Sequence, residues 1–506
     1  MRCTFDALRG DDNMTSMLHS GGSLRKCLFA SISVVALAAA APAALAAGAG
    51  MLDKTFGADG NADGTPDGVV STSLGSGDDV ANAVARAPSG EIVIAGSHFA
   101  KGSSDIIVAR YTHAGKLDKR FGADGNSDGT PDGVVDVSLG DGDDVATSVV
   151  VQPDSKVVVA GYHLDGKSKN IFVARFNENG SLDKSFGADG NADGAPDGVV
   201  NVSLGDGDDV ARAVALQPDG RIVVVGDTVK GSSSNILVAR FNKDGTLDKA
   251  FGADGGSDGT TDGFVSLDLG AGDDIANGLA LDGDGKIILV GSHKDNGSNN
   301  IIVARFSTDG TLDKGFGADG SRDGTPDGVV SQSLGTGDEV ARAVALDEKG
   351  RIVIAGTNTS TGGSSNILLA RFLPDGKLDA VFGADGGSDG TPDGFVSLDL
   401  GKGDDAAASM GIQPDGKIVV AGYHTEGDSK NIVVARYLDN GNLDAAFGAD
   451  GNSDGTPDGV FGISLGAGDD VANGVLIDGS KLIIVAGSTE DKDKSKNIVL
   501  LRLLAE

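Results

Sequence analysis

The chain has 506 residues, a formal net charge of −33, 81 glycines and no tryptophan. A negative field of this size repels phosphate backbones and anionic lipid headgroups and attracts cations, which excludes nucleic acid as a partner and favours a basic or cationic one. The only two cysteines, Cys3 and Cys27, lie near the N-terminus, so the rest of the chain has neither a disulfide framework, nor a cysteine nucleophile, nor a thiolate metal site.

The first 46 residues have the pattern of an export signal. Arg25 and Lys26 precede an apolar run that ends at Ala41, and Ala-Leu-Ala at 44–46 is a small-residue cleavage motif. We expect a signal peptide at 1–46, with Met17 as an alternative start, and a bacterial protein that is secreted, periplasmic or at the cell surface. No integral membrane span would remain after cleavage. The alternative is an uncleaved anchor, because the apolar run approaches spanning length.

A repeat follows the short linker expected at 47–51. The sequence FGADG returns every 65 residues, with one spacing of 66, at seven phenylalanines: Phe56, Phe121, Phe186, Phe251, Phe316, Phe382 and Phe447. A period this regular indicates a repeat architecture. We therefore expect a single domain at 52–506.

Each repeat contains four strand-like runs separated by turn residues. In the first repeat these are Val69–Leu74, Val80–Ala87, Glu91–Gly96 and Ile106–Tyr111. Runs such as IVIAG are apolar throughout, which indicates burial on both faces. The pattern predicts an all-β fold, a seven-bladed β-propeller of four-stranded antiparallel blades. A solenoid is the alternative, but it would need polar capping repeats, and neither end has one.

The repeats resemble a known family. Units such as AVALQPDGRIVVVGDTVKGSSSNILVARFNKDGTLDKAFG are similar to the bacterial delta-60 repeat, a propeller repeat related in pattern to the NHL repeat, and the resemblance covers residues 52–506. It implies that the run equivalent to Ala81–Ala87 is innermost and that the run after FG is outermost. Val69–Leu74 should then complete the last blade and close the ring. The resemblance implies nothing about function.

An acidic loop follows FG in every repeat, where that family would have a short glycine turn. Its pattern, D-x-N-x-D-G-x-x-D, offers oxygen ligands at alternating positions around a glycine turn, as calcium-binding loops do. It resembles the sites of integrin-type FG-GAP and thrombospondin type 3 repeats. Because the last glutamate of an EF-hand loop is missing, we expect about seven weak Ca²⁺ sites, with dissociation constants of about 10⁻⁴ to 10⁻³ M. The alternative is an Asx-turn loop that needs no ion.

The expected metal ligands are side chains of these seven loops. Four loops carry asparagine at the third position: Asp59, Asn61, Asp63, Asp67; Asp124, Asn126, Asp128, Asp132; Asp189, Asn191, Asp193, Asp197; and Asp450, Asn452, Asp454, Asp458. Three loops lack it: Asp254, Asp258, Asp262; Asp319, Asp323, Asp327; and Asp385, Asp389, Asp393.

An acidic pair precedes each innermost strand. The pairs are Asp78 and Asp79, Asp143 and Asp144, Asp208 and Asp209, Asp273 and Asp274, Asp338 and Glu339, Asp404 and Asp405, and Asp469 and Asp470. We expect the pairs at one mouth of the channel, where one acid caps backbone N–H groups or pairs with the arginine that recurs in the third strand. The functional alternative is a funnel for cations or a basic ligand. The recurring arginines are Arg110, Arg175, Arg240, Arg305, Arg371, Arg436 and Arg502.

Four histidines share one position, two residues after the glycine that ends the second strand. They are His98, His163, His293 and His424, and the other blades have threonine or asparagine there. Since small polar residues replace them, we interpret them as loop histidines without a function.

The repeats are nearly interchangeable, and we find no polar cluster confined to one blade, no nucleophile motif and no phosphate loop. Catalysis needs an asymmetric set of groups. We therefore expect a secreted, calcium-binding, monomeric propeller that serves as a non-catalytic binding or scaffold module for an unknown protein or a basic ligand. The alternatives are a metal-dependent enzyme with its site at the channel mouth and a protein that sequesters calcium or lanthanides. The scarcity of aromatic side chains disfavours a lectin.

Overall fold

The computed structural model describes part of the chain in atomic detail. The described residues are 48–59, 67–124, 131–187, 197–204, 207–252, 261–295, 297–317, 327–335, 337–359, 363–383, 393–448 and 458–506. The expected signal peptide lies outside them. Within them the secondary structure consists of strands, and no described helix is long and apolar enough to cross a membrane.

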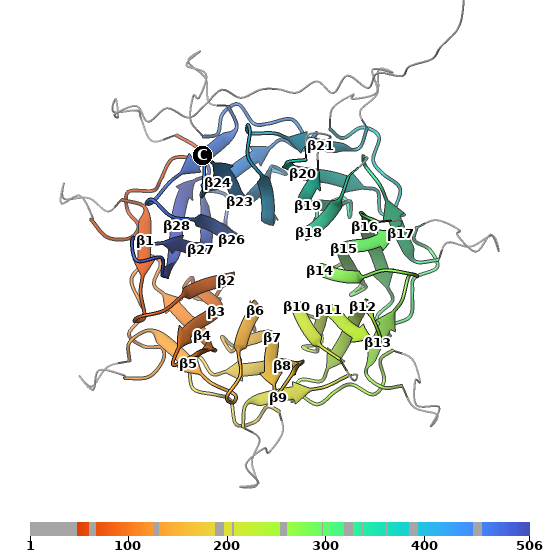
Figure 1. Cartoon of the computed structure of the whole chain (residues 1–506), viewed down its shortest axis with the longest axis horizontal. Helices are drawn as coiled ribbons and strands as arrows, with labels where there is room; N and C mark the ends of the chain where they lie inside the picture. Colours follow the sequence, from red (N-terminus) through yellow and green to blue (C-terminus); the bar gives the residue numbers. More distant parts are fainter. Residues whose placement is uncertain are drawn as a thin grey trace, which may run out of the picture.

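The strands form seven four-stranded antiparallel sheets arranged as blades around a central axis (Figure 1), which confirms the predicted propeller. The innermost strands are β2 (Asp79–Arg86), β6 (Asp144–Val151), β10 (Asp209–Leu216), β14 (Asp274–Leu281), β18 (Glu339–Leu346), β22 (Asp405–Ile412) and β26 (Asp470–Asp478). The second strands are β3 (Ile92–Ala100), β7 (Val157–Asp165), β11 (Ile222–Lys230), β15 (Ile287–Asp295), β19 (Ile352–Thr359), β23 (Ile418–Glu426) and β27 (Leu482–Glu490).

The outer two strands of each blade follow the same order. The third strands are β4 (Ser103–Tyr111), β8 (Ser168–Phe176), β12 (Ser233–Phe241), β16 (Ser298–Phe306), β20 (Ser365–Phe372), β24 (Ser429–Tyr437) and β28 (Lys496–Leu504). The outermost strands are β1 (Val69–Thr72), β5 (Val134–Val137), β9 (Val199–Val202), β13 (Phe264–Leu267), β17 (Val329–Gln332), β21 (Phe395–Leu398) and β25 (Val460–Ile463). Blade 1 is β2 to β5, the next five blades follow in sequence, and blade 7 combines β26 to β28 with β1.

The first strand closes the ring, as predicted. β1 pairs antiparallel with β28, so blade 7 takes three strands from the end of the chain and one from its beginning. Residues around the expected linker run beside the same strand: the backbone N–H of Gly50 donates to Leu504 at 2.7 Å and that of Asp53 to Arg502 at 2.8 Å. The ring is thereby closed by strand pairing instead of by packing alone.

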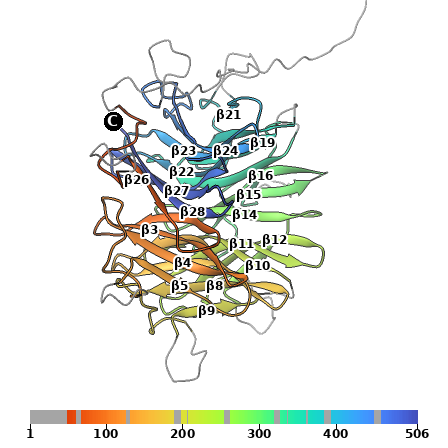
Figure 2. The ribbon, with the colours of Figure 1, turned by 60° about the vertical axis from the view of Figure 1, so that its left-hand side comes forward.

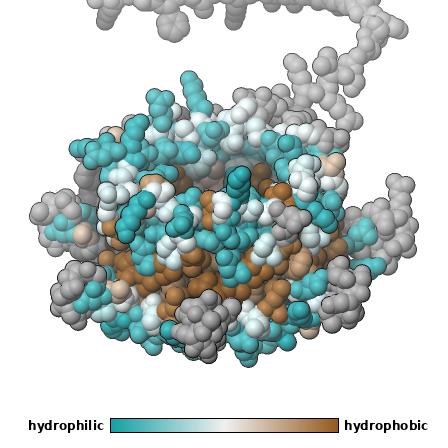
Figure 3. Space-filling view, turned by 60° about the horizontal axis from the view of Figure 1, so that its bottom comes forward, coloured by the Kyte–Doolittle hydropathy of each residue, from teal (hydrophilic) through white to brown (hydrophobic). Residues whose placement is uncertain are grey.

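The core lies between the blades. Ile92 and Ile94 of β3 pack with blade 7, whereas Val93 and Ala95 of the same strand pack with blade 2. All four side chains are fully buried. Because both faces of each blade meet a neighbour, the middle strands are apolar at consecutive positions. Figure 2 shows the strands of neighbouring blades stacked on one another. Figure 3 shows one side of the molecule, where a hydrophobic band lies below a polar edge.

The second and third strands are longer than the sequence predicts. β3 continues past Gly96 to Ala100, and β4 begins at Ser103, so the two form a hairpin in which His98 pairs with Asp105. The sequence does not predict this extension, because the end of the strand is placed from its apolar run and the residues of the extension are largely polar. The histidines therefore lie within or at the end of strands, and the expectation of loop histidines is wrong.

Candidate functional site

The stem of each acidic loop is closed by backbone hydrogen bonds. In the first loop, the N–H of Asp67 donates to the carbonyl of Ala58, and that of Gly68 to the carbonyl of Phe56, both at 2.9 Å. The second of these bonds recurs in all seven blades at 2.9 Å. The stem therefore brings the two ends of the loop together, with the first and ninth positions of the acidic pattern, Asp59 and Asp67, next to its base.

The described residues include only the ends of these loops. The expected ligands among them are Asp59, Asp67, Asp124, Asp132, Asp197, Asp262, Asp327, Asp393 and Asp458. The remaining expected ligands lie outside the described residues: Asn61, Asp63, Asn126, Asp128, Asp189, Asn191, Asp193, Asp254, Asp258, Asp319, Asp323, Asp385, Asp389, Asp450, Asn452 and Asp454. Within the described part of the chain, no group of three or more His, Cys, Asp or Glu side chains could hold a metal ion.

The phenylalanine at the head of each loop anchors the stem. All seven rings are fully buried. In blade 1, the guanidinium of Arg110 lies over the ring of Phe121, 4.8 Å from its centroid, and the other six blades repeat this cation–π contact. Gly122 follows with φ of 90°, and a Cβ there would lie 2.1 Å from the carbonyl of Val134, so only glycine fits.

The stem also belongs to the joint between blades. The N–H of Gly122 donates to the carbonyl of Asn179 in the next blade at 2.9 Å, and Arg110 Nη1 donates to the neighbouring carbonyl of Glu178 at 2.5 Å. Equivalent bonds occur at all seven junctions. The stem of each acidic loop is therefore part of the contact between two blades.

The recurring arginines pair with a different carboxylate from the one predicted. Arg110 Nε donates to Asp118 Oδ2 at 2.8 Å, and Asp118 belongs to the Leu-Asp turn that precedes FG instead of the acidic pair. The same turn supplies the partner in the other blades: Asp53, Asp183, Asp248, Asp313, Asp379 and Asp444. The prediction that the acidic pairs neutralise these arginines is therefore wrong.

The surroundings lower the pKa of four of these turn aspartates, Asp53, Asp118, Asp183 and Asp313. Burial by itself would raise the pKa of Asp313, but hydrogen bonds from Lys286 and from the N–H of Gly315, together with the charge of Arg305, lower that pKa to about 2. A carboxylate next to a buried arginine remains charged at any physiological pH.

The acidic pairs cap backbone N–H groups, as predicted, and in six of the seven pairs both members do so. Asp79 is fully buried, and its Oδ2 accepts from the N–H of Leu74 at 2.7 Å. Its neighbour Asp78 accepts from the N–H of Lys496 at 3.0 Å, at the start of β28 in blade 7. All seven first acids cap the third strand of the preceding blade in this way. The pairs thus fasten each blade to its neighbour.

Each of the four histidines contacts the second acid of its own blade. His98 Nδ1 lies 2.5 Å from Asp79 Oδ1, and the same distance separates the other three pairs: His163 and Asp144, His293 and Asp274, and His424 and Asp405. The carboxylate is thereby satisfied on one oxygen by the backbone and on the other by the imidazole. This arrangement is structural, because the carboxylate oxygens that would bind a metal are already used.

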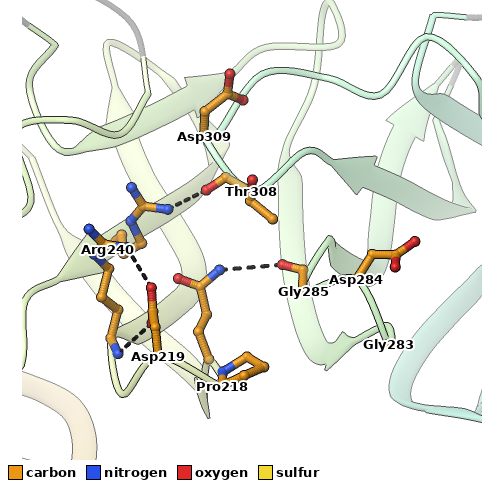
Figure 4. A pocket seen from close by; sticks show the side chains of 10 residues that line it. Pro218, Asp219, Arg240, Gly283, Asp284, Gly285, Thr308 and Asp309 are labelled. Atoms are coloured by element: carbon orange, nitrogen blue, oxygen red, sulfur yellow. Dashed lines mark hydrogen bonds and ion pairs between the residues drawn. The ribbon is translucent and has the colours of Figure 1, made fainter.

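A shallow pocket of about 540 Å³ lies between blades 3 and 4, on the face of the ring that carries the loop stems (Figure 4). Arg240 reaches across it to the carbonyl of Thr308, and Gln217 donates to the carbonyl of Gly285 at 3.3 Å. These groups hold the blade junction together. The pocket is therefore part of the repeated framework between two blades.

One asymmetric feature escaped the sequence analysis. Arg212 and Arg342 occupy equivalent positions in the innermost strands of blades 3 and 5, where other blades have Asn, Thr or Ala. Each is a single residue, so neither forms a polar cluster confined to one blade. The signal was present in the sequence as R in DDVARAV and DEVARAV, but only the fold places both residues at the axis.

Comparisons with known proteins support a propeller repeat. A family model described as a domain of unknown function (DUF5122) beta-propeller matches residues 87–121, 152–186, 217–251, 283–316, 350–382 and 413–447. Each matched segment runs from the turn before a second strand to the FG phenylalanine, so the acidic loops lie outside the matched segments. No curated protein matches the chain.

Several solved structures match the chain at low identity. A streptogramin B lyase is 11% identical, with a TM-score of 0.46, over 86% of this chain and 97% of that one. A protein of unknown function from Dyadobacter fermentans is 11% identical, with a TM-score of 0.41, over 87% and 98%. Sqt1 from Chaetomium thermophilum, bound to the N-terminus of ribosomal protein L10, is 13% identical, with a TM-score of 0.40, over 85% and 97%. At these identities the likeness is one of fold alone.

Proposed function

We propose that this β-propeller repeat protein is an exported, calcium-stabilised binding module without catalytic activity, related to the delta-60 repeats. The observation that carries the proposal is the sevenfold recurrence of one arrangement: an acidic loop whose stem is closed by backbone bonds and fastened to the next blade. A module of this kind needs a rigid ring more than it needs a reactive group.

The acidic loops would hold the ions. Each loop offers three carboxylates around a glycine turn, with an asparagine as well in four of the loops. Oxygen ligands of this type suit a hard cation such as Ca²⁺. The stem supports this role because it holds the first and last ligands of the pattern at one base. Carboxylates confined to one loop repel one another, and a divalent ion removes that repulsion.

Ion binding would stabilise the ring through mass action. For dissociation constants of about 10⁻⁴ to 10⁻³ M, 10 mM Ca²⁺ contributes about 1.4–2.7 kcal/mol for each site. Because each stem also bonds the adjacent blade, this free energy would strengthen the joints between blades. The effect suits the extracellular space or the periplasm, where the N-terminal export pattern would place the protein.

The test is calorimetric titration of the chelator-stripped chain with Ca²⁺, together with thermal melts at 0 and 10 mM Ca²⁺. We expect about seven weak sites and a large rise in melting temperature. The double variant Asp63→Ala and Asp67→Ala should lose one site and leave the ring folded. Its control is the double variant Asp154→Ala and Asp165→Ala, which removes the same charge from exposed turns outside the loops. Absence of binding, or seven sites in the loop variant, would refute the assignment.

A further inference from the structure

A β-bulge interrupts every innermost strand at the same place. In β2 the pairing with β3 shifts between Ala81 and Ala83, so Asn82 has no partner in the ladder. A bulge re-aims the extra side chain away from the regular pattern of the sheet. The extra residues of the seven blades are Asn82, Thr147, Arg212, Asn277, Arg342, Ala408 and Asn473.

In four blades the extra side chain ties neighbouring innermost strands together. Asn82 Nδ2 donates to the carbonyl of Ala146 in the next blade at 2.9 Å, and Thr147 donates to the carbonyl of Ala211 at 2.8 Å. Asn277 and Asn473 make the equivalent bond, both at 2.9 Å. These residues belong to the innermost strands, which lie nearest the central axis (Figure 1).

Blades 3 and 5 place an arginine at this position, and the two arginines differ in their partners. Arg212 Nε lies 2.5 Å from Asp227 Oδ1, on the adjacent strand β11. In blade 3, Asp227 lies opposite Val210 in the strand pairing. Blade 5 has Thr357 at the position equivalent to Asp227, opposite Val340. Threonine cannot neutralise a guanidinium. Among the described residues, Arg342 accordingly has neither an ion pair nor a hydrogen bond from its guanidinium.

Two neighbouring groups act on Arg342 among the described residues. The Arg342 side chain is exposed, but desolvation by the surrounding strands still lowers its pKa; Tyr423 acts in the opposite direction, and the charge of Arg212 lowers the pKa further. The Tyr423 ring in turn lies 4.4 Å from the ammonium of Lys430. Among the described residues, Arg342 is thus an arginine without an ion pair on an innermost strand, in a protein with a net charge of −33.

We propose that the channel binds a small ligand carrying an oxyanion group, a carboxylate or a tetrahedral oxyanion, which Arg342 holds with its guanidinium. The inference rests on the proposed function, because it names the ligand class of that binding module. A guanidinium offers parallel N–H donors that match two oxygens of such a group, and the bonds are charge-assisted.

The experiment uses the purified chain titrated by calorimetry with sodium sulfate and, separately, with sodium succinate. The two probes distinguish a tetrahedral oxyanion from a carboxylate. We expect one saturable site for at least one probe, weakened at least about tenfold in Arg342→Gln, as loss of a charged hydrogen bond predicts. Thr357→Asp should weaken binding of the probe equally. This variant keeps Arg342 but places a carboxylate beside it, as Asp227 is placed beside Arg212.

The controls separate local recognition from general charge effects. Lys377→Gln removes one positive charge from an exposed turn and should leave the affinity unchanged, whereas Arg342→Lys should keep part of it. The proposal is overturned if neither probe binds, or if Arg342→Gln binds as tightly as the parent chain. Calcium titration of the same samples keeps the two proposals apart, because none of these variants touches an acidic loop and each should retain every calcium site.

Discussion

Val69 and Leu501, residues from opposite ends of the propeller sequence, are paired partners in one antiparallel ladder. Through this pair and its three neighbours, β1 covers the outer edge of β28, which would otherwise present unpaired backbone groups to solvent. The relationship makes the stability of the whole ring depend on a four-residue strand.

Deletion of residues 1–74 should therefore destabilise the entire domain. The variant loses β1, Phe56 and the bonds of residues 50–53 to β28, so blade 7 is left with three strands and an open edge. We expect a lower melting temperature and association through the open edge, measured by calorimetry and light scattering. Deletion of residues 1–47 is the control and should melt like the mature chain. Equal melting of both deletions would contradict closure by β1.

The junction arginines should not tolerate replacement by lysine. Arg110 bonds Asp118 through Nε and the carbonyl of Glu178 through Nη1, while its plane covers Phe121, and a single ammonium cannot make all three contacts. We expect Arg110→Lys to cost about 2–4 kcal/mol in the free energy of unfolding, which approaches the penalty for breaking a buried ion pair. Denaturant titration measures the cost. Lys377→Arg, on an exposed turn, should change it by less than about 0.5 kcal/mol.

The fold was predictable because its signals are periodic. The period of FGADG gave the number of blades, the apolar runs gave the middle strands, and the chain beginning with an outermost strand gave the closure by Val69–Leu74. Each of these inferences uses one-dimensional information that the structure repeats in every blade.

The interactions of the charged residues were harder to predict, because they depend on which side chains meet in space. Arg110 pairs with Asp118, eight positions later, through a turn that the sequence marks only as a turn. His98 contacts Asp79 because β3 extends beyond Gly96, a length hidden by polar residues. The position of Arg342 is recognisable only in the structure, where it is the extra residue of a bulge in an innermost strand. In the sequence, a single arginine in an apolar run looks like ordinary variation between repeats.

The contribution of His424 to stability should depend on pH. The hydrogen bond from His424 to Asp405 raises the pKa of the histidine above its ordinary value, against the opposing effect of burial. A raised folded-state pKa stabilises the fold fully below the unfolded pKa of about 6.5, and this stabilisation is lost as the pH rises through the folded pKa. We expect His424→Asn to cost more at pH 5.5 than at pH 9, as measured by urea unfolding. His113→Asn, at an exposed position, is the control, and an equal pH dependence in both variants would contradict the assignment.

Blade 3 allows the opposite substitution, because no histidine faces the second acid of its acidic pair, Asp209. Asp209 is fully buried, and its Oδ2 accepts from the N–H of Leu204 at 2.7 Å, but its Oδ1 has no partner in the described structure. Thr228 stands opposite Asp209 in the register that His98 occupies opposite Asp79. Thr228→His should therefore supply the missing donor and stabilise the fold by about 1 kcal/mol, the net value of a typical buried hydrogen bond.

Denaturant titration of Thr228→His beside the reciprocal variant His98→Thr measures both directions of the exchange. His98→Thr should destabilise by about 1–3 kcal/mol, because it leaves Asp79 Oδ1 buried without a donor. The gain in blade 3 should be smaller than the loss in blade 1, since Thr228 is itself buried among neighbours that must make room for an imidazole. Thr228→Val, which fills a similar volume without a donor, controls for packing. If Thr228→His were no more stable than Thr228→Val, the histidine would serve only to fill space, and the pairing of imidazole with carboxylate would contribute nothing to the joint.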